Sequence, residues 1–121
     1  SKPTEAVDLL KEAQRRFPDS PLVPAEMGKT LMLLGRPAQA LPEFGRALAL
    51  EPRNAQALNN RGVALLALGQ RDAARQDFER ALDVNPCLFD ARFNLERVGG
   101  DAPPAADCRF SEEQIRLLRR R

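Results

Sequence analysis

The side chains that most often perform catalysis are scarce in this sequence. Its 121 residues contain no histidine, which removes the commonest general base and the commonest metal ligand. Asp and Glu are plentiful, but they fall on the polar faces of the expected helices as ordinary solvated charges. Gly28 and Gly62 lie inside helical patterns, and no GxGxxG motif is present, so these glycines do not indicate a phosphate-binding loop. We therefore expect no enzyme activity, no cofactor and no metal site.

Two adjacent amides, Asn59 and Asn60, are the most informative polar pair in the chain. Asn lowers helix propensity, so two in succession within an expected helix need a reason. One reason is recognition of an extended peptide, which requires amide donors and acceptors spaced along a groove. The other is that both side chains simply bond water or a neighbouring turn. The residues alone favour neither explanation.

The two cysteines, Cys87 and Cys108, have no metal-ligand spacing and are too few for a disulfide framework. We expect two thiols without a special role. The alternative is a disulfide that closes a loop of about 20 residues and stabilises the fold by roughly 3 kcal/mol.

Charge and hydropathy exclude several kinds of partner. The net charge is +2, and the basic residues at 116 and 119–121 are more often a solubilising last turn than a contact for nucleic acid. No apolar run approaches the roughly 18 residues of a membrane span, and no signal peptide opens the chain. The compartment stays open between cytoplasm and periplasm, and the Ala- and Arg-rich composition is typical of a GC-rich bacterial genome.

The elements that must position these side chains recur with a fixed period. Moving residues 55–86 by about 34 positions towards the N-terminus places their small, aromatic and proline residues on those of residues 21–52. The matching pairs are Gly28 and Gly62, Leu31 and Leu65, Gly35 and Gly69, Ala40 and Ala74, Phe44 and Phe78, Ala47 and Ala81, and Pro52 and Pro86. Such a period indicates a stacked array of helices.

Helical apolar spacing and the turn residues predict six helices in this array, over residues 3–17, 21–34, 37–50, 55–68, 71–84 and 88–98. We divide residues 1–98 into a half repeat (3–18), two repeats (21–52 and 55–86) and a partial repeat (88–98). A linker (99–110) and a C-terminal capping helix (111–121) follow, although the last helix could instead lead into another domain. The half repeat indicates that the chain begins inside a longer array, and its apolar face could mediate self-association through Val7, Leu10 and Phe17.

The small residues of the repeat indicate close contact between its helices. Gly28 and Gly62 let the two helices of a repeat approach each other, because any side chain would separate the axes. Phe44 and Phe78 are expected to fill the space between adjacent repeats.

The repeat resembles the tetratricopeptide repeat family, whose unit is a helix–turn–helix of about 34 residues. The resemblance covers residues 3–98 and departs from the family mainly at aromatic positions, such as Leu58 and Leu65. It implies an all-α, right-handed superhelical solenoid of stacked antiparallel helix pairs, in which the first helices line a concave groove. On that groove the resemblance places the residues that we expect to bind a partner, Lys29, Gln56, Asn59, Asn60, Val63, Asn94 and Arg97, together with Met32, Leu33, Asp90 and Phe93.

Some members of this family grip the C-terminal carboxylate of a chaperone with basic and Asn residues, and that pattern mostly fails here. Asn60 matches one of the Asn positions, but Ala25 stands where a Lys is required and Lys29 replaces another Asn. Asp90 and Asn94 replace a Lys and an Arg, and Asp90 would repel a carboxylate. We expect negligible affinity for an acidic C-terminal peptide.

The sequence thus predicts a non-catalytic scaffold that binds a peptide segment or partner protein in the concave groove, as part of a larger protein or complex. The alternative is a substrate- or partner-selecting repeat module of a larger enzyme, such as a glycosyltransferase or sulfotransferase.

Overall fold

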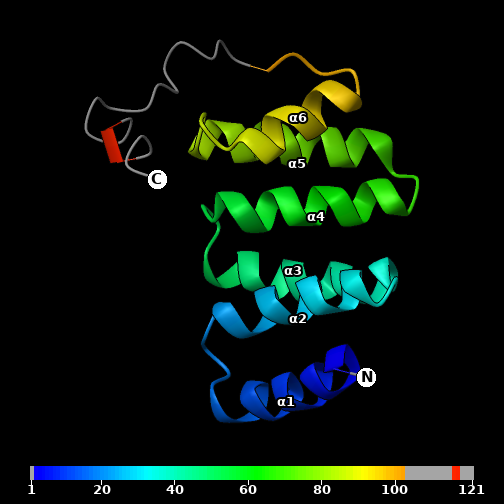
Figure 1. Cartoon of the computed structure of the whole chain (residues 1–121), viewed down its shortest axis with the longest axis vertical. Helices are drawn as coiled ribbons and strands as arrows, with labels where there is room; N and C mark the ends of the chain where they lie inside the picture. The colour runs from blue at the N-terminus through cyan, green and yellow to red at the C-terminus, as the bar shows by residue number, and fades with distance from the viewer. Residues whose placement is uncertain (1, 103–115, 118–121) are drawn as a thin grey trace.

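The protein is a stack of helices in a computed structural model that describes residues 2–102 and 116–117. Within these residues six helices and no strands are present, so the fold is all-α as the sequence predicts. The helices are α1 (Lys2–Arg16), α2 (Leu22–Leu33), α3 (Pro37–Leu50), α4 (Ala55–Ala67), α5 (Arg71–Val84) and α6 (Phe89–Arg97). They follow one another along the long axis of the molecule, from α1 at one end to α6 at the other (Figure 1). Their bounds lie within about one residue of the predicted ranges, whereas the predicted linker and capping helix fall mostly outside the described residues and stay predictions.

Glycine turns join the two helices of each repeat. Gly35 and Gly69 adopt positive φ angles of 72° and 80°, which residues with a side chain rarely take. The next backbone N–H bonds back into the preceding helix, as in the 2.9 Å bond from Gln70 to the carbonyl of Leu65. Gly99, with a φ of 83°, ends α6 in the same way. It comes about one helical turn early relative to the period, so α6 is shorter than α2 and α4.

A glycine and a phenylalanine set the distance between the helices of each repeat. A Cβ atom added to Gly28 would lie 2.5 Å from the ring of Phe44, and one added to Gly62 would lie 2.5 Å from the ring of Phe78. Both rings are fully buried. The prediction that these glycines permit close approach is therefore confirmed. Phe44 also belongs to a core cluster with Ala64 of α4, so it connects its own repeat to the next.

Two expectations need correction, one about the self-association surface of α1 and one about the state of Cys87. Val7 is buried against the core, so it cannot contribute to a self-association surface on α1. The exposed large apolar side chains of that end are Leu9 and Phe17. Cys87 is disulfide-bonded rather than an idle thiol. Cys108, the other cysteine of the sequence, lies outside the described residues.

Candidate functional site

The first helices of the successive repeats, α2, α4 and α6, form one continuous surface, which we call the α2–α4–α6 face. Because each short turn reverses the chain, these three helices run in the same direction. Asn94 of α6 donates a 3.0 Å hydrogen bond to Asn59 of α4, and a pocket joins α2 to α4. This face carries all the residues that the sequence nominated for partner binding: Lys29, Gln56, Asn59, Asn60, Val63, Asn94 and Arg97.

A pocket of about 300 Å³ lies on this face between α2 and α4, and we call it the α2–α4 pocket. Its lining is mainly apolar, with Met32 and Leu33 from α2, Val63 from α4 and Phe44 beneath them, while Lys29 and Asn60 complete it. Leu33 is 82% exposed, which is unusual for a large aliphatic residue beside an open pocket. The structure therefore brings three of the nominated residues together, Lys29, Asn60 and Val63. They surround an apolar pocket that the sequence analysis did not predict.

The two adjacent asparagines have different roles. Asn59 is only 3% exposed, and its side-chain oxygen accepts the hydrogen bond from Asn94. It therefore holds α6 against α4 and has little surface left for a ligand. The side chain of Asn60 is part-exposed and accepts a 3.2 Å hydrogen bond from Gln56, one turn earlier on α4. Among the described residues the amide nitrogen of Asn60 has no hydrogen-bond acceptor, so it is available to donate to a bound carbonyl.

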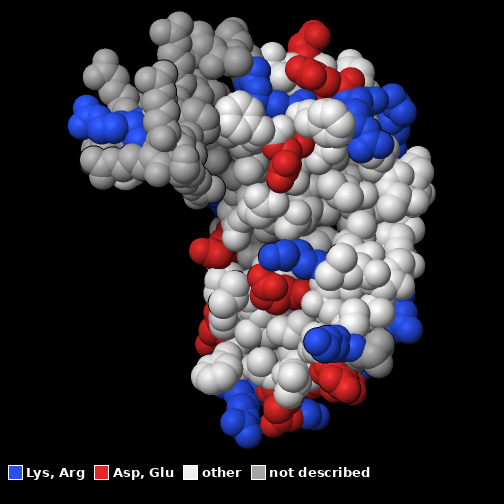
Figure 2. Space-filling view, in the orientation of Figure 1, with Lys and Arg blue, Asp and Glu red and all other residues white. Residues whose placement is uncertain are grey.

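Charges on the α2–α4–α6 face balance one another. Lys29 forms a 3.1 Å ion pair with Glu26 on its own helix. At the other end of the face, the guanidinium of Arg97 lies 5.7 Å from the centre of the Phe93 ring. Asp90 is exposed and forms no ion pair with another described residue. In the view of Figure 2, positive and negative side chains are interspersed with neutral ones, without a large patch of one sign.

A largely buried ion pair with two hydrogen bonds was not predicted from the sequence. Arg61 of α4 donates two hydrogen bonds, of 2.7 and 2.8 Å, to the carboxylate of Asp77 on α5. The side chain of Asp77 is only 3% exposed and that of Arg61 is 26% exposed. The hydrogen bond to Asp77 raises the pKa of Arg61, against the lowering effect of burial and with a further contribution from the nearby negative charge. This pair connects the two helices of one repeat and lies outside the α2–α4 pocket.

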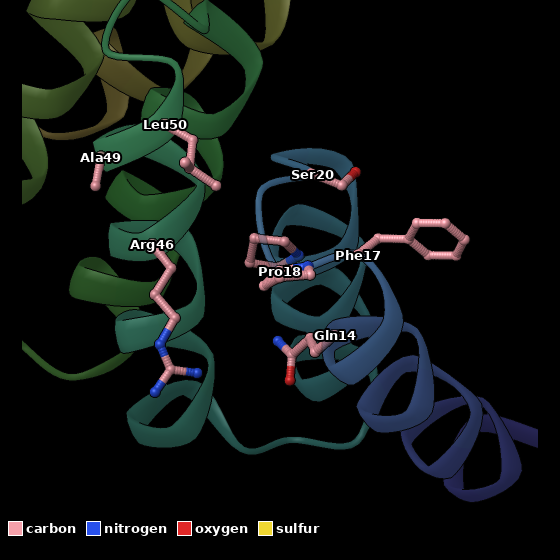
Figure 3. A pocket seen from close by; sticks show the side chains of 8 residues that line it. Gln14, Phe17, Pro18, Ser20, Arg46, Ala49 and Leu50 are labelled. Atoms are coloured by element: carbon pink, nitrogen blue, oxygen red, sulfur yellow. The ribbon is translucent and has the colours of Figure 1, made fainter.

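A different kind of pocket lies between the second helices of neighbouring repeats. Gln14 and Pro18 line the first of these, opposite Arg46, Ala49 and Leu50 of α3 (Figure 3). Its volume is about 370 Å³, and a similar pocket of about 360 Å³ recurs one repeat later. In Figure 3 the Phe17 ring points away from α3. Arg46 is already paired with Glu43 at 2.8 Å, so this pocket offers neither an open cation nor the nominated residues.

The described residues give no sign of a metal centre or of a membrane span. They contain no group of three His, Cys, Asp or Glu side chains that could hold a metal ion. None of their helices is long and apolar enough to cross a bilayer.

Comparison with known proteins identifies which helical repeat this is. The family model for the tetratricopeptide repeat matches residues 26–86, which is half of the chain. The chain belongs to the tetratricopeptide repeat family.

Known relatives agree with that assignment. The chain is 29% identical over 94 residues to human RNA polymerase II-associated protein 3, covering 78% of this chain and 14% of that protein. It is 38% identical over 81 residues to the rat FK506-binding protein-like protein, covering 67% of this chain and 23% of that protein. The chain therefore spans less than a quarter of the length of either relative.

Solved structures show the same arrangement of helices. The first tetratricopeptide domain of Spaghetti (RPAP3), bound to the HSP90 peptide SRMEEVD, superimposes with a TM-score of 0.78 at 29% identity. The superposition covers 80% of this chain and 77% of that one. The protein MamA superimposes with a TM-score of 0.73 at 25% identity, covering 76% of this chain and 54% of the other.

Proposed function

We propose that this chain is a non-catalytic scaffold that binds a peptide segment or a partner protein on its α2–α4–α6 face. The observation that carries the proposal is the α2–α4 pocket, which combines the exposed Leu33 with the available amide of Asn60. An apolar hollow with a few polar groups at its edge is the usual form of a ligand site. The similar domain of Spaghetti (RPAP3) is bound to a peptide, which supports peptide binding as a function of this fold.

The same geometry argues against the ligand of that relative. The peptide SRMEEVD has three acidic side chains. On this chain Lys29 is already paired with Glu26, and Asp90 adds an exposed negative charge to the face. We therefore retain the proposal that this chain does not bind acidic chaperone tails.

The absence of catalysis is part of the proposal. The sequence has no histidine, and the polar groups of the α2–α4 pocket are a lysine and an amide rather than an acid, a base and a nucleophile. No observation favours the alternative of a module that belongs to an enzyme. Self-association through α1 would have to use Leu9 and Phe17, and light scattering over a range of concentrations would detect it.

Affinity capture with a matched pair of variants tests the proposed function. The test variant is Lys29→Ala/Asn60→Ala, which removes both polar groups of the α2–α4 pocket. The control is Lys11→Ala/Gln39→Ala, which removes the same two chemical groups from exposed positions on α1 and α3. We expect partners in an extract of the native organism to be retained by the wild type and the control but lost by the test variant. Equal retention by all three proteins would contradict the proposed function.

A further inference from the structure

Three apolar side chains cross the α2–α4–α6 face on a diagonal. Leu33, Val63 and Phe93 come from α2, α4 and α6, and each follows the previous one by 30 residues rather than by the 34 of the repeat. Each residue therefore lies about one helical turn nearer the start of its helix than the one before. Leu33 and Phe93 are 82% and 62% exposed, and Val63 lines the α2–α4 pocket between them.

The surroundings of this diagonal are polar but have no excess charge. Lys29 is paired with Glu26, Arg97 lies over the Phe93 ring, and Asp90 is an exposed acid of α6. The charges of Lys29 and Arg97 are balanced by those of Glu26 and Asp90, so a ligand with several negative charges would meet no net positive charge there. The amide of Asn60 instead offers a donor that suits the carbonyl of an extended backbone.

The dimensions of the diagonal set the length of its ligand. Two helix spacings of roughly 9 Å, with an axial offset of eight residues at about 1.5 Å each, separate Leu33 from Phe93 by about 22 Å. An extended chain rises about 3.3 Å per residue, so about seven residues cover this distance. In such a segment the first and seventh side chains point to the same side, because the period of an extended chain is two.

We propose that the α2–α4–α6 face selects an extended, uncharged peptide segment of about seven residues, with aliphatic side chains at its two ends. One end contacts Leu33 and the α2–α4 pocket, and the other packs on Phe93. Asn60 donates to a backbone carbonyl between them. Asn59 and Asn94 position the diagonal, because their hydrogen bond fixes α6 relative to α4. This inference rests on the proposed function and adds to it the chemistry of the ligand.

Selection from a random twelve-residue peptide library tests the inference, with the acidic peptide SRMEEVD as a comparison. We expect selected peptides to carry aliphatic residues six positions apart, without enrichment of Asp or Glu, and we expect no measurable binding of SRMEEVD. The best peptide should bind Leu33→Ser and Phe93→Ser at least tenfold more weakly than the wild type, because each exchange removes an apolar contact. Both positions are largely exposed, so thermal unfolding should confirm that the variants fold.

The control variant is Leu9→Ser, which makes the same exchange at a position on α1 that is 72% exposed. It should bind the selected peptide like the wild type. Enrichment of acidic residues, or tight binding of SRMEEVD, would overturn the inference and leave the proposed function intact. Peptides that bind all three variants equally, or a selection that enriches no peptide, would also overturn the inference, and the capture experiment with Lys29→Ala/Asn60→Ala tests the proposed function separately.

Discussion

The two complete repeats, residues 21–52 and 55–86, share the packing contact between a glycine and a phenylalanine but differ in the polar contacts of the residues beside it. Gly28 lies under the ring of Phe44 in the first repeat, and Gly62 lies under the ring of Phe78 in the second, with the same contact distance. These pairs hold the two helices of each repeat at the same separation. The geometry of the repeat is thus set by a small residue and a ring, and it does not depend on any charged group.

The residues that directly precede each glycine and each phenylalanine follow no such rule. Where the first repeat has a buried Met27, the second has Arg61, which forms a 2.7 Å ion pair with Asp77. Glu43 occupies the position of Asp77 in the first repeat, and it instead accepts a 2.8 Å hydrogen bond from Gln14 of α1. The same backbone site therefore accommodates an apolar contact or an ion pair. The comparison teaches that the ring and the glycine define the fold, while the ionic groups are an exchangeable addition.

The largest difference between the repeats should appear when the acid of each is removed. Asp77→Ala leaves the partly buried charge of Arg61 without its partner, so we expect a loss of about 3 kcal/mol in the free energy of unfolding. Glu43→Ala should cost about 1 kcal/mol, because Arg46 remains solvated and the variant loses only its exposed ion pair and the part-buried hydrogen bond from Gln14. Urea denaturation of both variants measures the contrast.

The double variant Arg61→Met/Asp77→Leu is the control for this prediction, since it replaces the ion pair by two apolar side chains, one of them the methionine that the first repeat has at the equivalent position. Its stability should lie close to that of the wild type. A double variant as unstable as Asp77→Ala would contradict the view that the ion pair is exchangeable.

Replacing a glycine by alanine should have opposite effects at a glycine that packs against a phenylalanine ring and at Gly45, which has open space around it. Gly62→Ala forces the Phe78 ring to move, and we expect a net loss of about 1–2 kcal/mol after the gain in helix propensity. Gly28→Ala should behave alike. Gly45→Ala, in α3, has open space around it and should stabilise the protein by about 0.5–1 kcal/mol. Thermal unfolding of the three variants measures these changes in stability. A stabilised Gly62→Ala would contradict the claim that the Phe78 ring leaves no room for a side chain at this position.

The smallest expected effect concerns the amides of the second repeat. Asn59→Ala copies Ala25 of the first repeat and removes the acceptor of the Asn94 bond, which should lower the free energy of unfolding by about 1 kcal/mol. Asn60→Ala should leave stability nearly unchanged and weaken peptide binding instead. Urea denaturation and titration with peptide separate the structural role of Asn59 from the binding role of Asn60. Two variants that behave identically in both assays would contradict these roles.

The parts of the structure that the sequence predicted are those that recur with its period. Glycine, alanine, phenylalanine and proline repeat in phase, and so the helices and their close approach at Gly28 could be placed in advance. That the Phe44 ring lies over the glycine of its own repeat was not predicted. The distinction between Asn59 and Asn60 could not, because it depends on α6 approaching one side of α4. The Arg61–Asp77 pair was hidden for a similar reason. Its partners are 16 residues apart, and the equivalent residue in the first repeat is a methionine.

The candidate site was predicted in part for the same physical reason. Positions such as Lys29 and Val63 follow from the resemblance to a repeat whose first helices line a groove. The hollow between them depends on how Met32, Leu33 and Phe44 pack, which a pattern of residue types does not determine.

The most direct test of the binding face is an NMR titration of isotope-labelled protein with a selected peptide. It measures the chemical-shift change of each backbone amide on binding. We expect the largest shifts around Leu33, Val63 and Phe93, on the first helices of three successive repeats. Largest shifts at Gln14, Arg46 and their neighbours would place the ligand in the pocket between second helices instead. That result would contradict the assignment of the α2–α4–α6 face as the binding site.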